Sequence, residues 1–361
     1  MKRFSGRLAV QQRVLPSYRA SFFDLLASAC DGGMSLFTGL PRPGEGITTT
    51  DQLQVTNYYL GQNIHLFSGS LYLCYQLGLI GWLKNWNPDA LIVEANPRYL
   101  ATSSAVEWMQ RRDRPIIGWG LGSPPVHGFR KRRRRSFLSQ FDALIAYSQR
   151  GADEYLALGF PRERIFVAHN SVSRAPISPP GHRPLTVDRF TILFVGRLQA
   201  RKRIDLLLRA CAQLDSNPRL VIVGDGPERG RLESLAKEIY PSAEFIGGRR
   251  GAELKPYFLE ADLFVLPGTG GLAIQEAMSY GLPVIVAQGD GTQDDLVRQE
   301  NGWQILPDNF DALLATMKDA LSDIARLRKM GEESYRIVRE EINLEEMVET
   351  FVMALNTLSS K

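Results

Sequence analysis

Short runs of β-branched and other apolar residues alternate with amphipathic segments along most of this chain. The runs predict strands at residues 8–12, 35–39, 90–95, 115–119, 143–148 and 165–169, and then at 191–196, 219–224, 244–247, 263–267 and 283–287. Between them, segments such as 204–214 and 229–239 carry apolar residues at the 3.6-residue period of a helix. This alternation predicts βαβ units and two parallel sheets, an α/β fold of two doubly wound domains.

A break in the pattern separates the two halves. Residues 173–183 (SRAPISPPGHR) are rich in Pro, Ser and Gly and have no apolar period, which is typical of a linker. The 361 residues are too many for one ordinary core and suit two domains. We therefore predict an N-terminal domain over 1–175 and a C-terminal domain over 176–361, with a final helix that can pack back on the first domain.

Three other segments lead to less regular expectations. Residues 42–60 are polar and threonine-rich, with a weak strand pattern near 55–59, and favour a loop or hairpin. The longest apolar stretch, 71–83 (LYLCYQLGLIGWL), falls short of the roughly 20 residues that span a membrane, so we interpret it as a buried helix. Residues 310–358 are helical, with breaks expected at Gly331 and Asn343.

Composition excludes a disordered chain, because 44% of residues are hydrophobic and 23% are charged. Three scattered cysteines without a CxxC or Cys/His cluster argue against structural zinc and favour a reducing compartment. The apolar run at the N-terminus is too short for a signal peptide. Residues 1–175 contain 21 Lys and Arg against 12 Asp and Glu, whereas the remainder contains 22 against 27. The first half is therefore expected to face an anionic partner.

A basic turn follows the first strand of the second half. In VGRLQARKR (195–203), Arg197 and Lys202 lie just beyond the strand end. Cations at the carboxyl end of a parallel strand are well placed to clamp a diphosphate. A solvated basic turn is the alternative. The next strand runs into VGDGPERG, where the glycines allow a tight turn and Pro227 suits the first position of a helix.

The segment PGTGGLAIQEAMSYG (267–281) combines a glycine-rich turn with a helix start near Leu272. Free N–H groups at a helix start form an anion site together with the helix dipole. Gly270 and Gly271 would let phosphate oxygens approach the backbone. Glu276, one turn further on, could accept hydrogen bonds from a pair of hydroxyls such as a ribose, or it could be an ordinary exposed helix residue.

The order of these motifs resembles the second domain of retaining glycosyltransferases of the family-four type, which have the GT-B fold. GRLQARK, LVIVGDGPER, YFLEADLFVLP, QEAMSYGLPVIVA and ENGWQILP carry the resemblance over residues 190–307, and DALIAYSQRGADEYLALGF with RIFVAHNSV extends it more weakly into the first half. The resemblance implies two Rossmann-like domains facing across a cleft. It also implies a nucleotide-sugar donor in the second domain and no metal or other cofactor.

Site residues follow from the same resemblance. Arg197 and Lys202 would hold the diphosphate and stabilise the leaving group, and Glu276 would bind the ribose hydroxyls. The remaining predicted donor-binding residues are Gly196, Ile246 (through its backbone, at the base), Gly270, Gly271 and Leu272.

The sequence departs from the family pattern at one informative position. The family has a second glutamate eight residues before the one that matches Glu276, and this chain has Gly268 there. We hypothesise that Gly268 leaves room for a different sugar or substituent. The family's first-domain histidine is also absent from the expected turn, and His127 is given no role.

The first half offers two further candidates. FRKRRRR contains six consecutive cations, Arg130, Lys131, Arg132, Arg133, Arg134 and Arg135. Such a run favours an anionic membrane surface, with Phe129 and Phe137 reaching the interface. A solvated helix face is the alternative, and nucleic acid is not expected. Tyr18 and Arg19 follow the first strand and could line the cleft, although Arg19 could equally cap local structure.

These observations predict a glycosyltransferase that moves a hexose from a UDP- or GDP-sugar to a hydroxyl of a glycan or lipid-linked saccharide, with retention, in cell-envelope or exopolysaccharide synthesis. We expect it in the cytoplasm, peripheral at the inner face of the cell membrane. A non-catalytic nucleotide-sugar-binding protein and a nucleotide-sugar 2-epimerase are the alternatives.

Overall fold

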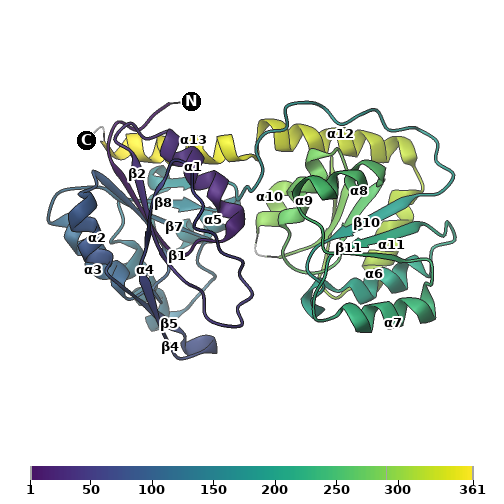
Figure 1. Ribbon diagram of the computed structural model, residues 1–361, viewed down its shortest axis with the longest axis horizontal. Helices are drawn as coiled ribbons and strands as arrows, with labels where there is room; N and C mark the ends of the chain where they lie inside the picture. The colour runs from purple at the N-terminus through teal and green to yellow at the C-terminus, as the bar shows by residue number, and fades with distance from the viewer. Residues whose placement is uncertain (1, 290, 360–361) are drawn as a thin grey trace. The chain divides into compact units, whose positions relative to one another are not determined.

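The computed structural model describes residues 2–289 and 291–359, which divide into two compact units (Figure 1). Unit 1 comprises residues 1–172 and 344–361, and unit 2 comprises residues 173–343. This division lies close to the predicted boundary at 175/176. The last helix, α13 (Leu344–Ser359), belongs to the first unit, the domain on which the sequence analysis allowed a final helix to pack.

Unit 1 is built on a seven-stranded parallel sheet of order β3-β2-β1-β6-β7-β8-β9. Its strands are β1 Leu8–Val14, β2 Met34–Gly39, β3 Asn57–Leu60, β6 Ala90–Glu94, β7 Ile116–Gly120, β8 Ala143–Ala146 and β9 Ile165–Val167. Its helices are α1 Ala20–Ser28, α2 Leu79–Trp86, α3 Ala101–Gln110, α4 Gly128–Leu138, α5 Gln149–Ala157 and α13. The central strands are buried along most of their length because helices cover both faces of the sheet.

Helix α13 completes one of the two core layers of unit 1. Its residue Phe351 packs edge-on against Trp119 of β7 and Phe22 of α1, with ring centroids 4.9 and 5.0 Å away. Helices α2, α3 and α5 pack on the opposite face of the sheet. Figure 1 shows α13, the yellow segment at the end of the chain, beside the purple α1.

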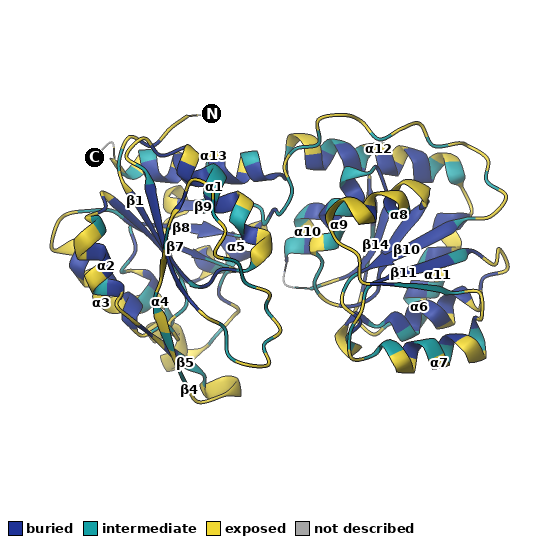
Figure 2. Ribbon diagram, in the orientation of Figure 1, coloured by how far each residue is buried: buried dark blue, intermediate teal, exposed yellow. Residues whose placement is uncertain are grey.

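Unit 2 is built on a six-stranded parallel sheet of order β12-β11-β10-β13-β14-β15. Its strands are β10 Thr191–Val195, β11 Arg219–Val223, β12 Glu244–Gly247, β13 Leu263–Leu266, β14 Val284–Ala287 and β15 Gly302–Ile305. Its helices are α6 Ile204–Cys211, α7 Arg229–Ile239, α8 Lys255–Glu260, α9 Leu272–Ser279, α10 Thr292–Leu296, α11 Phe310–Leu321 and α12 Ile324–Glu340. Figure 2 shows β10 and β14 dark blue, whereas the edge strand β12 is half-buried and the outer helix α7 carries exposed residues.

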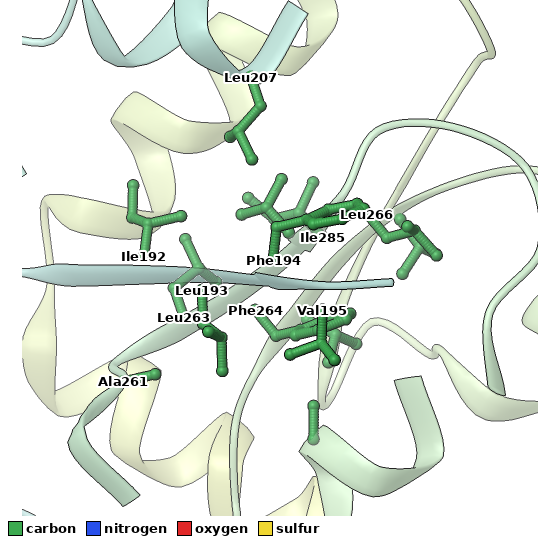
Figure 3. Packing of buried hydrophobic residues seen from close by; sticks show 14 of the residues in the cluster. Ile192, Leu193, Phe194, Val195, Leu207, Ala261, Leu263, Phe264, Leu266 and Ile285 are labelled. Atoms are coloured by element: carbon green, nitrogen blue, oxygen red, sulfur yellow. The ribbon is translucent and has the colours of Figure 1, made fainter. Parts of the chain in front are cut away.

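The core of unit 2 fills both faces of this sheet. Side chains alternate along a strand, so Phe194 and Val195 lie on opposite sides of β10 (Figure 3). Each side is packed with aliphatic residues from neighbouring strands and helices. The sheet is therefore a rigid base for the loops at its carboxyl edge.

The fold bears out the α/β prediction and corrects it at four places. Residues 71–83 are not one buried helix: they contain strand β5 (Leu73–Leu77), paired with β4 (Gln62–Leu66), and the start of α2. The strand β15 was not predicted, whereas residues 42–56 form the expected loop before the edge strand β3. Pro227 precedes the helix rather than starting it, since α7 begins at Arg229.

The fourth correction concerns Gly331, which lies inside α12 and does not break it. A Cβ at Gly331 would stand 2.2 Å from the carbonyl oxygen of Gly281. This glycine is therefore present for a close backbone approach rather than for a turn. The helix break lies instead before Ile324, where the Asp323 side chain accepts a hydrogen bond from Arg326 N–H.

Candidate functional site

The carboxyl ends of β10 and β13 mark the point where the strand order of unit 2 reverses. From β10 the chain proceeds through β11 to β12 on one side, and from β13 through β14 to β15 on the other. Ligands of open parallel sheets bind in the crevice at such a point. The two loops that leave it, 196–203 and 267–271, are the segments singled out from the sequence. The Thr269 N–H joins them by donating to the Arg201 carbonyl at 3.0 Å.

Lys202 provides a buried positive charge at this point. It ends the short 3-10 helix η4 (Ala200–Lys202), and only 8% of the residue is exposed. Within the described residues no carboxylate forms an ion pair or hydrogen bond with its ammonium. Burial, together with the nearby Arg201 charge, lowers the pKa of Lys202 to about 8. A buried ammonium group without a carboxylate partner favours the binding of an anion.

Gly270 lies where two cationic side chains converge. A Cβ at this position would stand 3.1 Å from Lys202 Nζ and 3.2 Å from Arg201 Nη1. Gly270 also has a φ of +83°, which a residue with a side chain rarely adopts. The sequence analysis identified Lys202 but missed Arg201. Its only signal was its place beside Lys202 in the basic turn.

Helix α9 begins immediately after this turn, at Leu272. Its N-cap residue Gly271 provides no side-chain cap, and the first turn contains no acidic residue. The first backbone N–H groups of a helix and its dipole attract an anion. Arg201, Lys202 and the start of α9 thus form a cluster of side-chain and backbone donors at the residues expected to bind phosphate.

Gly268 does not leave an open space, contrary to the hypothesis from the sequence. A Cβ there would stand 2.2 Å from the Arg201 carbonyl oxygen and 2.5 Å from Lys202 Cα. The backbone of the basic turn therefore occupies the volume that any side chain at position 268 would need. Gly268 allows that turn to lie against the end of β13, which in turn brings Lys202 to Gly270.

Glu276 is half-buried on α9, one turn beyond the helix start. Burial raises the pKa of its carboxyl group. Among the described residues, its carboxylate has no hydrogen-bond or ion-pair partner. The neighbouring Gln275 is fully committed to the fold, since it donates to the Ile342 carbonyl at 2.7 Å. A desolvated carboxylate without a partner is suited to accept hydrogen bonds from a ligand.

The other predicted donor-site residues lie on different elements of unit 2. Arg197 is exposed directly after Gly196 at the end of β10, and Ile246 lies half-buried on the edge strand β12. Gly224 serves packing, because a Cβ there would stand 1.9 Å from the Gly196 carbonyl oxygen. The glycines of VGDGPERG thus allow two loops to touch.

Tyr18 and Arg19 lie in unit 1 and differ in exposure. Tyr18 is 46% exposed, whereas Arg19 is buried. The Arg19 guanidinium donates to the Asn170 side chain at 2.5 Å and lies 5.4 Å from the centre of the Trp119 ring. Arg19 therefore links η1 (Ser17–Arg19) to the segment after β9 within this unit.

Unit 1 has its own reversal of strand order, between β1 and β6, and a polar cluster lies there that the sequence analysis missed. Glu94 ends β6 and accepts a hydrogen bond from Arg13 N–H. Burial raises the pKa of Glu94 to about 7. The Arg13 side chain pairs with Glu45 at 2.9 Å. These residues come from distant parts of the sequence, so no local motif indicates them.

The six consecutive cations lie on α4, whose surface is mostly exposed. Arg134 is half-buried and donates to Ser123 Oγ at 2.7 Å. Phe129 is 73% exposed, while Phe137 is half-buried and packs edge-on against Phe141. Within the described residues, no helix is long and apolar enough to cross a membrane.

The fold and this site define a class: an α/β protein of two Rossmann-like units, the second of which has a cluster of cationic side chains at its switch point. Residues 182–337 match the family model described as glycosyl transferases group 1. A GDP-mannose-dependent alpha-mannosyltransferase of Corynebacterium glutamicum is 34% identical over 284 residues, which cover 72% of this chain and 65% of that protein. The putative colanic acid biosynthesis glycosyltransferase WcaL of Escherichia coli K12 is 29% identical over 198 residues, which cover 51% of this chain and 48% of that protein.

A solved structure matches the whole chain. Anabaena Alr3699/HepE in complex with UDP has a TM-score of 0.72, with 17% identity and complete coverage of both chains. The chain has the GT-B fold, and its second unit belongs to the glycosyl transferases group 1 family. It spans about half the length of several curated relatives that it matches.

Proposed function

We propose that this chain is a glycosyltransferase that moves a hexose from a nucleotide diphosphate-sugar to a hydroxyl of a glycan or lipid-linked saccharide. The observation that carries the proposal is the buried Lys202 ammonium, which shares the Gly270 turn with Arg201 and has no carboxylate partner among the described residues. A diphosphate supplies the negative charge that this site lacks. The names of the matched mannosyltransferase and colanic acid proteins support a role in cell-envelope or exopolysaccharide synthesis.

In the proposed reaction, the bond between the sugar C1 and the diphosphate oxygen breaks and a bond from C1 to the acceptor oxygen forms. Negative charge develops on the departing phosphate, and Arg197, Arg201 and Lys202 stabilise it in place of a metal ion. The proton of the acceptor hydroxyl passes to the departing phosphate on the same face of the sugar. This route retains configuration at C1 and needs no carboxylate nucleophile.

Base and ribose occupy the remainder of the proposed donor site. Glu276 accepts hydrogen bonds from the ribose hydroxyls, because its carboxylate is desolvated and otherwise unused. The backbone near Ile246 lines the base, and the N–H groups at Gly271 and Leu272 contact the phosphates. Binding measurements with UDP and GDP distinguish a site for uracil from a site for guanine.

The test is titration calorimetry with UDP, GDP and ADP, followed by product analysis with the matching sugar donors. We expect micromolar binding of one diphosphate and a loss of at least tenfold in both Lys202→Ala and Arg197→Ala. Arg209→Ala, on the exposed surface of α6, is the matched control and should bind normally. Undiminished binding in both site variants would refute the clamp. Binding without transfer or hydrolysis would indicate a binding protein, and sugar inversion without an acceptor would indicate an epimerase.

Membrane association belongs to the same proposal. The cations of α4 are expected to hold the chain at the inner face of the cell membrane, where lipid-linked acceptors are found. Flotation with vesicles containing anionic lipid tests this, and failure to float at moderate salt would exclude it.

A further inference from the structure

A cavity of about 880 Å³ opens in unit 1, outside the candidate donor site. One wall comes from the hairpin region, η2 (Gly69–Leu71) and the start of β5. The second comes from residues 97–103, which follow β6, and the third from α4. The volume lies within the range of small-molecule sites, about 300–1,000 Å³. Two of the walls follow strand ends of the sheet, where ligands of parallel sheets bind.

The lining of this cavity combines two chemistries. Four arginines face it, Arg98, Arg130, Arg133 and Arg134, and none of its described lining residues is acidic. None of the three α4 arginines forms an ion pair with a described carboxylate. The remaining surface is largely apolar and includes Phe67, Leu71, Leu100 and Phe137. A fully solvated basic helix would not need such an apolar wall.

The apolar part of the cavity is unusually accessible. Leu71 is 72% exposed, Phe67 is 69% exposed and Leu100 is 42% exposed. They come from two segments distant in sequence, yet they line one cavity. Exposed apolar side chains that gather in this way mark a binding surface rather than chance exposure.

Helical spacing sorts the cations of α4 into two sets. Arg130, Arg133 and Arg134 share one face with Phe137, at spacings of three, four and seven residues, and line the cavity. Lys131 and Arg132 belong to the same helix and do not line it. The structure therefore separates two roles that the run of six cations does not distinguish: attraction to a charged surface and recognition of one anionic group.

We propose that this cavity binds a lipid phosphate: a single anionic phosphate group held by Arg130, Arg133 and Arg134, with its hydrocarbon chain along Phe67, Leu71 and Leu100. Arginine guanidinium groups bind phosphate through paired hydrogen bonds, and the apolar wall removes the chain from water. The proposed ligand is one molecule in a defined site rather than a membrane surface as a whole.

The cavity also adjoins the switch point of unit 1. Tyr72 lines it, and the Arg42 guanidinium lies 4.4 Å from the centre of the Tyr72 ring. Arg42 and Arg13 both pair with Glu45 at this switch point. If the chain transfers a sugar, the lipid phosphate is the carrier of the acceptor. That assignment rests on the proposed function, whereas the binding site itself does not.

The experiment measures binding of farnesyl phosphate to the full chain without any donor, by calorimetry below the critical micelle concentration. Inorganic phosphate and farnesol are the matched probes for charge alone and chain alone. We expect farnesyl phosphate to bind at least tenfold more tightly than either. If farnesol bound as tightly as farnesyl phosphate, the arginines would not recognise the phosphate group. If inorganic phosphate bound as tightly, the apolar wall would not hold the hydrocarbon chain. Either result would overturn the proposal.

Two double variants with the same loss of charge provide the decisive comparison. Arg130→Ala with Arg133→Ala should weaken farnesyl phosphate binding at least tenfold, and Lys131→Ala with Arg132→Ala should change it less than twofold. Equal losses in the two variants would show surface electrostatics and overturn the proposal. Leu71→Asp should weaken farnesyl phosphate and leave inorganic phosphate unchanged. The side chains replaced in these variants of unit 1 are exposed, so circular dichroism should confirm an unchanged fold. Lys202→Ala, which tests the donor site in unit 2, should bind farnesyl phosphate normally.

Discussion

Replacing Gly268 by alanine tests the packing on which the candidate donor site depends. The added Cβ would lie 2.2 Å from the Arg201 carbonyl oxygen and 2.4 Å from the Lys202 carbonyl carbon, whereas ordinary contacts begin at 3.4 Å. The atoms in the way belong to the backbone, so a rotamer change cannot relieve the clash. Overpacking of this kind costs about 1–3 kcal/mol of folding free energy. Because each kcal/mol lowers the melting temperature of a unit of this size by about 2–4 °C, Gly268→Ala should unfold roughly 2–12 °C lower.

The same substitution should also weaken diphosphate binding, because the basic turn must move away from β13 and take Lys202 with it. Differential scanning calorimetry gives the melting temperature, and titration with the preferred nucleoside diphosphate gives the affinity. Gly230→Ala is the matched control: Gly230 is an exposed residue of α7 with no atom within 4 Å of an added Cβ, so alanine should stabilise the helix by about 0.5–1 kcal/mol. Wild-type melting temperature and affinity in Gly268→Ala would refute this reasoning.

Three further predictions follow from the described contacts. Diphosphate affinity should fall about tenfold or more as pH rises through and above 8, because Lys202, whose pKa is lowered to about 8, then loses its proton and its charge-assisted hydrogen bond to the phosphate. Lys202→Arg should abolish this pH dependence, and an affinity that is flat from pH 7 to 9.5 would contradict the prediction. Asp262→Ala should lower the free energy of unfolding in urea by about 3–5 kcal/mol, because it leaves the buried Arg328 guanidinium, 2.7 Å from Asp262, without its carboxylate. The control Asp319→Ala removes an exposed ion pair and should lower that free energy by less than about 1 kcal/mol. Equal losses in the two variants would count against burial as the cause. Sugar transfer should persist in excess EDTA, and a loss that Mg²⁺ restores would show that the basic residues do not replace a metal.

Most of the parallel strands could be predicted because they contain a short run of buried apolar residues and are followed by a turn. The elements that were missed are half-exposed. The strand β5 lies inside an apolar string that was interpreted as a helix, although its residues alternate between buried and exposed. The strand β15 is only four residues long and contains Gln304, so its apolar signal is weak. Residues 71–83 form one apolar string in sequence, but several of its side chains line an open cavity instead of a core.

The candidate site was predictable only where one segment contains the signal. Lys202 and Glu276 belong to recognisable local patterns. The role of Arg201 and the constraint at Gly268 arise from two loops that touch at the hydrogen bond between Thr269 and Arg201, 68 positions apart in sequence. Glu94 and Glu45 meet Arg13 in the same way. Sequence patterns show which residues follow a strand, whereas the packing of neighbouring loops determines which of those residues meet.

The place of α13 affects the order in which the chain can fold during synthesis. Unit 2 has all its residues between 173 and 343, so it can close as soon as they have left the ribosome. Most of unit 1 is synthesised first but lacks α13 until residues 344–359 have been made, and until then Phe22 and Trp119 lack the aromatic contact with Phe351. The N-terminal part of the nascent chain therefore keeps an apolar face that a chaperone could bind. Premature termination before residue 344 would leave a complete second unit attached to an unfinished first one.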